Sequence, residues 1–90
     1  MQKNIKTKYY ASFTEFRHPI RLLAEVTMEQ TATMFSYLKG TFDEKNRLIV
    51  VERFINQHFH YKLEYTYSEN NKIKMARLHK ENNEIITLVF

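Results

Sequence analysis

Glu52 is the acidic residue with the most unusual setting, because it interrupts a run of apolar residues. Pairing Leu48–Phe54 with His58–Tyr67 through a tight turn near residues 56 and 57 predicts that Glu52 lies on the apolar face, opposite Tyr61. A carboxylate there must find a partner or shift its pKa upwards. The candidate partners are the Tyr61 hydroxyl and the guanidinium groups of Arg17 and Arg21. A structural hydrogen bond or ion pair is the simpler interpretation, and a ligand-binding or acid-base role is the alternative.

His58 and His60 are two residues apart, so both imidazoles could reach one metal ion from the same side of a strand. Glu64 would be a further oxygen donor on that side. Such a set does not complete a metal site, and solvent-facing histidines opposite an aromatic stripe are the simpler interpretation. We therefore expect neither a metal nor a cofactor.

The composition excludes several kinds of catalysis. The chain has no cysteine, a single glycine and a single aspartate, and its serines stand only at positions 12, 36 and 68. Thiolate chemistry and Gly-rich phosphate loops are therefore excluded, and a Ser-His-Asp triad is not expected. The aspartate, Asp43, begins a predicted turn, where its carboxylate would bond the backbone two residues further on. These absences favour a protein that is not an enzyme.

Thirteen phenylalanine and tyrosine side chains could stack on the bases of single-stranded nucleic acid if they lay beside basic residues. The basic candidates on the polar face are Lys39, Arg53, Lys62 and Lys74. Strict alternation along 58–67 places the stripe from Phe59 to Tyr67 on the face opposite Lys62, so core packing is the simpler use of the rings. The candidate binding residues are Glu52, Arg53, His60, Tyr61, Lys62 and Tyr65.

These side chains are positioned by strands that end in asparagine-containing loops. The segments Phe42–Leu48, Tyr67–Ile73 and His79–Ile85 share a pattern of Glu, a variable residue, Asn, a charged residue and then Leu or Ile. The pattern is typical of hairpin loops in which a type I turn precedes a left-handed residue. Asn46, Asn71 and Asn83 would take that left-handed position.

The loops divide the chain into short strands. The expected strands are Thr33–Phe42, Leu48–Phe54, His58–Tyr67, Lys72–Leu78 and Glu84–Phe90, in meander order. Because one apolar face of the sheet must be covered, we expect either that the N-terminal part lies across it or that the sheet curls on itself. In the last strand Ile86, Leu88 and Phe90 are apolar on the face opposite Ile85 and Val89, which favours curling.

The first third of the chain has a weaker pattern. Lys8–Phe13 resembles a strand, and Ile20–Val26 is a second strand with helix as the alternative. Thr27 and Gln30 have the spacing of a capping box, which predicts a helical turn over residues 28–32. We expect a mostly β protein, or an α+β protein with one short helix, built as an antiparallel meander of five to seven strands in a curled sheet or partly open barrel.

Length and charge limit the classes of protein. Ninety residues fit one domain, residues 1–90, and the longest apolar run, Leu48–Val51, is far too short for a membrane helix. The net charge of +4 is spread over both halves, which is more typical of a solvated surface than of a nucleic-acid footprint. No apolar stretch follows the early lysines, so we expect no secretory signal and a cytoplasmic location.

Several stretches together resemble a family of short bacterial proteins of unknown function. They are Tyr9-Tyr10, Pro19-Ile20-Arg21-Leu22, Phe42–Leu48, Glu52, Tyr61–Tyr67, Asn71 and Lys74–Arg77. The resemblance covers nearly the whole chain and implies no catalytic residue, because the family has no assigned activity. Tyr65–Ile73 also looks like the tyrosine-aspartate repeats of Rhs-type proteins, although Ser68 and Asn71 replace their usual Asp and Gly. That similarity implies a local hairpin only.

Together these features favour a non-enzymatic interaction or binding module. Its sheet edge or tyrosine-bearing face would receive another protein chain, either a different protein or a second copy in a homodimer. The alternative is a domain that binds single-stranded nucleic acid. A third hypothesis is a small-ligand site or enzyme around Glu52 inside a half-closed barrel.

Overall fold

Asparagine side chains allow the backbone to reverse between strands. In the computed structural model, which describes residues 5–14 and 18–90, Asn46, Asn71 and Asn83 have φ angles of 64°, 65° and 69°. Each donates its backbone N–H to the carbonyl three residues earlier, at 2.9 to 3.0 Å. This is a type I turn followed by a left-handed residue, which Asn tolerates because its side chain is short and polar. The three predicted loops are confirmed.

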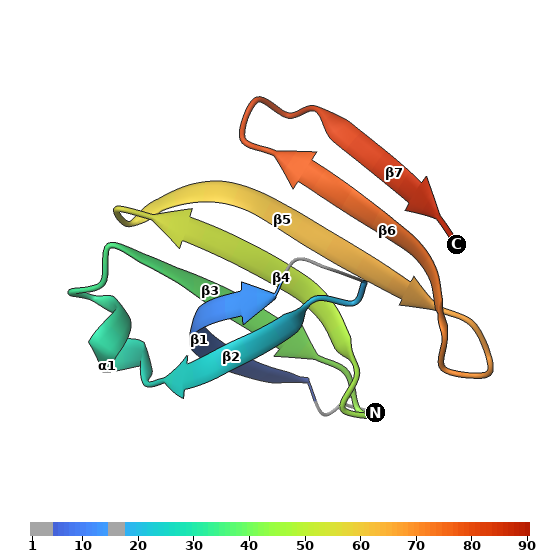
Figure 1. The fold of residues 1–90 in the computed structure, drawn as a ribbon, viewed down its shortest axis with the longest axis horizontal. Helices are drawn as coiled ribbons and strands as arrows, with labels where there is room; N and C mark the ends of the chain where they lie inside the picture. The colour runs from blue at the N-terminus through green and yellow to red at the C-terminus, as the bar shows by residue number, and fades with distance from the viewer. Residues whose placement is uncertain (1–4, 15–17) are drawn as a thin grey trace.

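Within the described residues the chain forms seven strands and one short helix. They are β1 (Lys6–Thr14), β2 (Arg21–Val26), α1 (Met28–Thr31), β3 (Ser36–Phe42), β4 (Leu48–Ile55), β5 (His58–Tyr67), β6 (Ile73–Lys80) and β7 (Ile85–Val89). The strands lie in one antiparallel sheet in the order β2-β1-β3-β4-β5-β6-β7 (Figure 1). The predicted five-strand meander is therefore β3 to β7, and the N-terminal hairpin adds two strands beside β3.

The segment between β2 and β3 follows its capping signal. The Thr27 hydroxyl accepts a bond from the Gln30 N–H at 3.2 Å, and the Gln30 side chain accepts one from the Thr27 N–H at 2.8 Å. The predicted capping box is thus confirmed. Two further turn bonds follow α1, at the N–H groups of residues 33 and 34, so β3 begins at Ser36 and not at Thr33 as predicted.

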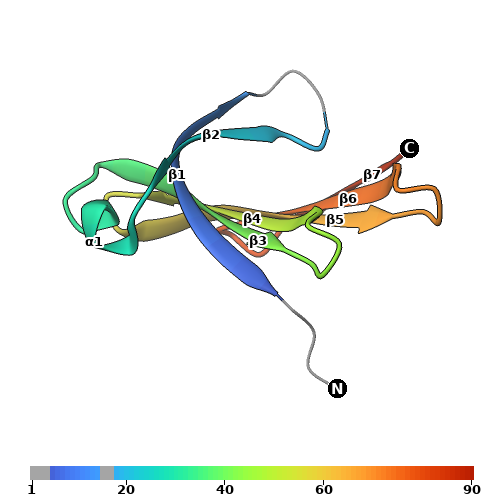
Figure 2. The ribbon, with the colours of Figure 1, turned by 90° about the horizontal axis from the view of Figure 1, so that it is seen from below.

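β1 changes its partner along its length. Residues 6–10 pair with β3, whereas residues 9–14 pair with β2. Figure 2 shows the second half of β1 leaving the plane of the other strands and carrying β2 with it. Leu22 of this hairpin approaches Gly40 of β3 so closely that a Cβ at Gly40 would lie 2.6 Å from its Cδ1. The hairpin therefore folds over one face of the sheet, which curls as predicted and remains unclosed.

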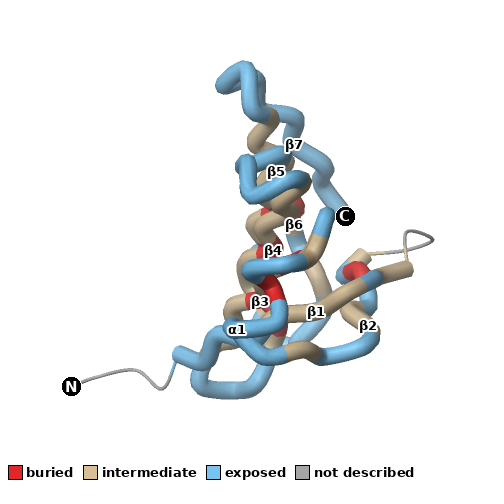
Figure 3. The backbone as a smooth tube through the Cα atoms, turned by 90° about the vertical axis from the view of Figure 1, so that its left-hand side faces the viewer, coloured by how far each residue is buried: buried red, intermediate tan, exposed pale blue. Residues whose placement is uncertain are grey.

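We call the face under the β1–β2 hairpin the covered face and the opposite one the open face. The buried apolar residues are Ile20, Leu38, Leu48, Val51, Leu63, Tyr65 and Ala76. The buried residues that belong to strands lie on the covered face, and Ile20 packs against them from the segment before β2. Apart from Thr31 of α1, the buried residues belong to this interior, whereas β7 is exposed along its whole length (Figure 3).

Two of the three bulges in the sheet decide which face carries the predicted site residues. Phe54 pairs with Phe59, as predicted, but Arg53 pairs with Tyr61, so His60 is an extra residue in β5. Likewise Ile49 is an extra residue of β4 opposite β3. Because side chains alternate, one inserted residue moves the following side chains to the other face relative to the expected register. The predicted register between β4 and β5 assumed unbroken alternation. It is right at Phe54 and wrong from Arg53 back towards Leu48.

Candidate functional site

Tyr65 holds the N-terminal segment against the sheet. Its hydroxyl accepts a hydrogen bond from the Ile20 N–H at 3.2 Å and lies 2.8 Å from His18 Nδ1. Burial raises the pKa of Tyr65 from its ordinary value of 10.0 to about 12. The phenol is thus a neutral structural anchor between β5 and the segment before β2.

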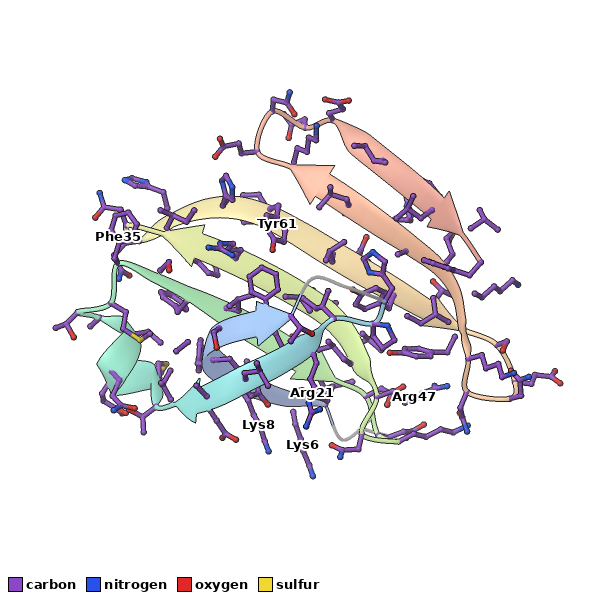
Figure 4. The ribbon with its side chains drawn as sticks, in the orientation of Figure 1. Lys6, Lys8, Arg21, Phe35, Arg47 and Tyr61 are labelled. Atoms are coloured by element: carbon purple, nitrogen blue, oxygen red, sulfur yellow. The ribbon has the colours of Figure 1, made fainter. Side chains whose placement is uncertain are left out.

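An apolar groove of about 500 Å³ opens beside this anchor, between the N-terminal hairpin and β5–β7. Its apolar lining residues are Phe13, Ile20, Leu63, Leu78, Ile86 and Leu88. The polar residues His18, His60, Tyr61, Lys80, Glu81 and Asn82 line the rest. Tyr61 lines this groove from β5 (Figure 4). The groove reaches from the core to the last strand of the sheet.

β7 forms one end of this groove and one edge of the sheet. Its sequence, IITLV, contains no charged residue, and each of its five residues is exposed. Ile86 and Leu88 pair with residues of the covered face, whereas Ile85 and Val89 lie on the open face, so the predicted alternation is confirmed. Within the described residues β7 pairs with β6 alone and stays exposed at all five positions.

The open face carries a row of aromatic rings across four strands. Tyr9 and Tyr37 have ring centroids 6.1 Å apart, Tyr37 stacks on Phe54 at 5.1 Å, and Phe54 meets Phe59 at 6.3 Å. The bulge at His60 places Phe59 on this face. The prediction that Phe59 shares a face with the tyrosines of β5 is therefore wrong. Lys39 and Lys62 lie on the same face as the row, because they pair with Tyr9 and Glu52.

Glu52 lies on the open face and not among the apolar side chains. It pairs with Lys62 of β5 and with Lys39 of β3, and its Oε1 is 3.9 Å from the Lys39 Nζ. The predicted position opposite Tyr61 is wrong because of the bulge. The expectation of a carboxylate placed among apolar side chains therefore does not hold. Of the other proposed partners, Arg21 begins β2 opposite Thr14, and Arg17 lies outside the described residues.

Arg53 takes the place that was predicted for Glu52. It pairs with Tyr61, and its guanidinium carbon lies 5.1 Å from the centre of the Phe13 ring on the N-terminal hairpin. The prediction that Arg53 belongs to the polar face is wrong for the same reason. Its cation rests on an aromatic ring at the junction of hairpin and sheet, which is a favourable contact for a guanidinium group.

The histidines do not gather around Glu64. His60 lies at the groove and approaches Glu81, with Nδ1 to Oε2 at 3.9 Å, and Glu64 instead bonds His79 of β6. Residues 5–14 and 18–90 contain no group of three or more His, Asp or Glu side chains that could hold a metal ion.

The whole chain was compared with known families and proteins. The model of a family of unknown function, DUF6156, matches residues 2–90. The chain belongs to this family. The expected membership of a family without an assigned activity is thereby confirmed, and the similarity to Rhs-type repeats stays a prediction. No curated protein and no solved structure matches the chain.

In this DUF6156 chain the candidate site is defined by the geometry of its own residues. Of the candidate residues, Glu52 and Lys62 are neighbours on the open face, and Arg53 pairs with Tyr61 on the covered face. The residues predicted from the sequence did not include Phe13, His18 and Ile20, which form the N-terminal wall of the groove. The sequence feature that points to this wall is the apolar Ile20 directly after the only proline. No helix of the described part of the chain has the length and apolarity of a membrane span.

Proposed function

We propose that this protein is a non-enzymatic interaction module that binds an extended polypeptide segment along β7. The observation that carries the proposal is the uncharged, fully exposed edge strand. An edge strand presents unpaired N–H and C=O groups, and exposed edges are normally blunted by charges, proline or bulges. β7 has none of these features. The cytoplasmic location expected from the sequence is part of this proposal.

The groove supplies the contacts that select the bound strand. Alternate side chains of an added strand point towards the covered face, where Ile86, Leu88 and Leu78 line the groove. The other side chains lie on the open face beside Ile85 and Val89. Main-chain bonds thus supply affinity, and apolar residues at every second position supply selectivity.

A fluorescein-labelled heptapeptide of alternating valine and threonine is a suitable probe of this site. We expect its fluorescence anisotropy to rise with the wild-type protein, whereas a peptide N-methylated at every residue should not bind, because it has no backbone N–H on either edge. Thr87→Pro should abolish binding, and the matched Thr87→Ala should preserve it. Equal binding of both peptides, or no binding of either by a monomeric protein, would contradict strand addition.

A second candidate function is supported by the aromatic row of the open face. Because Phe59 lies on the side of Lys39 and Lys62, rings and cations share one face, and this combination suits single-stranded nucleic acid. The affinity for a labelled ten-nucleotide oligomer should then fall steeply between about 50 and 200 mM salt. Phe54→Leu should weaken binding, with Phe13→Leu on the covered face as control. No binding at low salt would exclude this function.

A further inference from the structure

The β7 edge also indicates which strand it receives. We propose that its occupant is a second copy of this chain, with the two β7 strands antiparallel about a two-fold axis through Thr87. This rests on the proposed function and names its partner. The two sheets then become one continuous sheet, and the interface is isologous, because the same surface is used by both copies.

The backbone of β7 has the symmetry that such pairing needs. Phe90 donates to the carbonyl of Lys74, and Glu84 accepts from the N–H of Lys80, so the even-numbered residues of this segment bond to β6. In an antiparallel ladder alternate residues face alternate sides, so both backbone groups of residues 85, 87 and 89 point outward. These three residues are arranged symmetrically about Thr87. With the axis at Thr87, all three find partners in the second copy.

The side chains match in the same register. Ile86 lies opposite Leu88 of the second copy on the covered face, and Ile85 lies opposite its Val89 on the open face. The Thr87 residues of the two copies lie opposite each other at the axis. Apolar and β-branched pairs of this kind stabilise cross-strand contacts. The apolar lining of each groove, which ends at Ile86 and Leu88, then continues into the other copy.

The charges of the chain do not oppose this pairing. β7 itself carries none, although the net charge is +4. The nearest cation on the open face is Arg77, which pairs with Thr87. Two β7 strands separate the Arg77 residues of the two copies, so at ~4.8 Å per strand they are about 14 Å apart. That distance exceeds the Debye length of about 8 Å at physiological salt. Lys6, Lys8 and Arg21 lie on the β1–β2 side of the molecule, away from β7 (Figure 4).

The other edge of the sheet, β2, is poorly suited to the same role. It carries the charged residues Arg21 and Glu25, and Ala24 has a φ angle of 62°, which interrupts the regular ladder. Charges and irregular backbone are the features that keep an edge strand from pairing. Pairing between two copies of β7 is therefore favoured over pairing of β7 with β2.

The exposed surface of β7 is large enough for a reversible dimer. Ile85, Ile86, Leu88, Val89 and Phe90 remain 48%, 37%, 42%, 79% and 60% exposed. For side chains of this size that leaves roughly 500 Å² exposed on each copy, so pairing buries at most on the order of 1,000 Å², which is the size of weak, reversible interfaces.

Sedimentation equilibrium of the wild-type protein tests this pairing. We expect the average mass to rise towards twice the monomer value between about 1 µM and 1 mM protein. Thr87→Pro should weaken association at least tenfold, because it removes an outward N–H while leaving the bonds to β6 in place. Thr87→Ala retains that N–H and is the control. A wild-type chain that stays monomeric throughout would overturn the dimer.

Two charged substitutions of Thr87 at the axis test the register. They remain informative even where the Thr87→Pro variant does not fold. Thr87→Lys and Thr87→Glu each place like charges opposite each other, so each should associate at least tenfold more weakly than wild type. Thr87→Glu should weaken association less than Thr87→Lys, because Arg77 of the same chain lies beside position 87. An equimolar mixture should restore association. Unchanged dimers of either variant alone, or no recovery in the mixture, would overturn pairing at Thr87.

The heptapeptide assay separates the two levels of the proposal. Suppose that the wild-type chain is monomeric and binds the alternating peptide, and that Thr87→Pro abolishes this binding. The strand-binding function would then stand, and the homodimer would be overturned. A chain that neither dimerises nor binds the peptide would overturn both.

Discussion

At the scale of single residues, Tyr65 has the clearest role. Its phenol is almost fully buried, and its hydroxyl joins β5 to Ile20 and His18 of the N-terminal segment. A buried hydroxyl is stable only when it is hydrogen-bonded, and an ionised phenolate would be costly there. Tyr65 therefore acts in folding, and its raised pKa makes this role measurable.

Tyr65→Phe should lower the free energy of unfolding at pH 7 by about 1–2 kcal/mol, because the Ile20 N–H loses its acceptor. The folded-state pKa of Tyr65, about 12, exceeds the ordinary value of 10.0. The contribution of the neutral phenol to the free energy of unfolding is therefore complete below pH 10 and is lost as the pH rises to about 12. Urea unfolding of both proteins from pH 7 to 12 should therefore show the difference narrowing above pH 10.

Tyr37→Phe, on the open face, is the matched control and should change stability by less than about 0.5 kcal/mol. A difference between wild type and Tyr65→Phe that stays constant through pH 12 would contradict the buried, neutral phenol.

At the scale of elements, the N-terminal hairpin decides the shape of the protein. β1 joins the sheet through β3 and then carries β2 over the covered face. The two layers approach closely at Gly40, where the Leu22 methyl group occupies the space that a side chain would need. Gly40 is thus required by contact between layers, since its φ angle is not positive.

Gly40→Val should destabilise the protein by about 1–3 kcal/mol, because the added methyl groups would overlap with Leu22. Combining it with Leu22→Ala should cost less than the sum of the two single changes, with a coupling of about 0.5–3 kcal/mol in a double-mutant cycle. Urea unfolding measures each variant. Thr41→Val, the next residue on the open face, is the control and should show no coupling to Leu22.

At the scale of the whole molecule, stability is unevenly distributed. Leu38 and Val51 are 2% and 0% exposed at the centre of the sheet, whereas all of β7 is exposed at its edge. A small sheet with a single covered face gains little from its outermost strand. The free edge therefore belongs to the least protected part of the described chain, and a bound strand would stabilise it.

Amide hydrogen exchange should follow this gradient. Backbone amides of Leu38 and Val51 should exchange most slowly, and in dilute protein those of residues 85, 87 and 89 should exchange faster than those of 86 and 88. Raising the concentration should protect the fast set selectively. Equal protection along β7 in dilute solution would contradict the outward-facing assignment, and NMR exchange measurements can resolve single residues.

The sequence by itself determined the strands, the three asparagine loops and the capping box, because these depend on interactions within a few residues. Asn46, Asn71 and Asn83 can adopt the positive φ angles that these loops require, and two-residue alternation needs only the local backbone. The sequence also showed that the last strand is apolar on both faces. It could not show whether other elements cover those faces.

Only the tertiary structure decided the faces and the site. The extra residues Ile49 and His60 are unpaired in the ladder, and nothing in the local pattern distinguishes them from ordinary strand residues. Their insertion depends on how whole strands pack, and it places Glu52 on the open face and Arg53 against Phe13. The groove and the free edge likewise depend on where the N-terminal hairpin stops covering the sheet, which is set by contacts between distant segments.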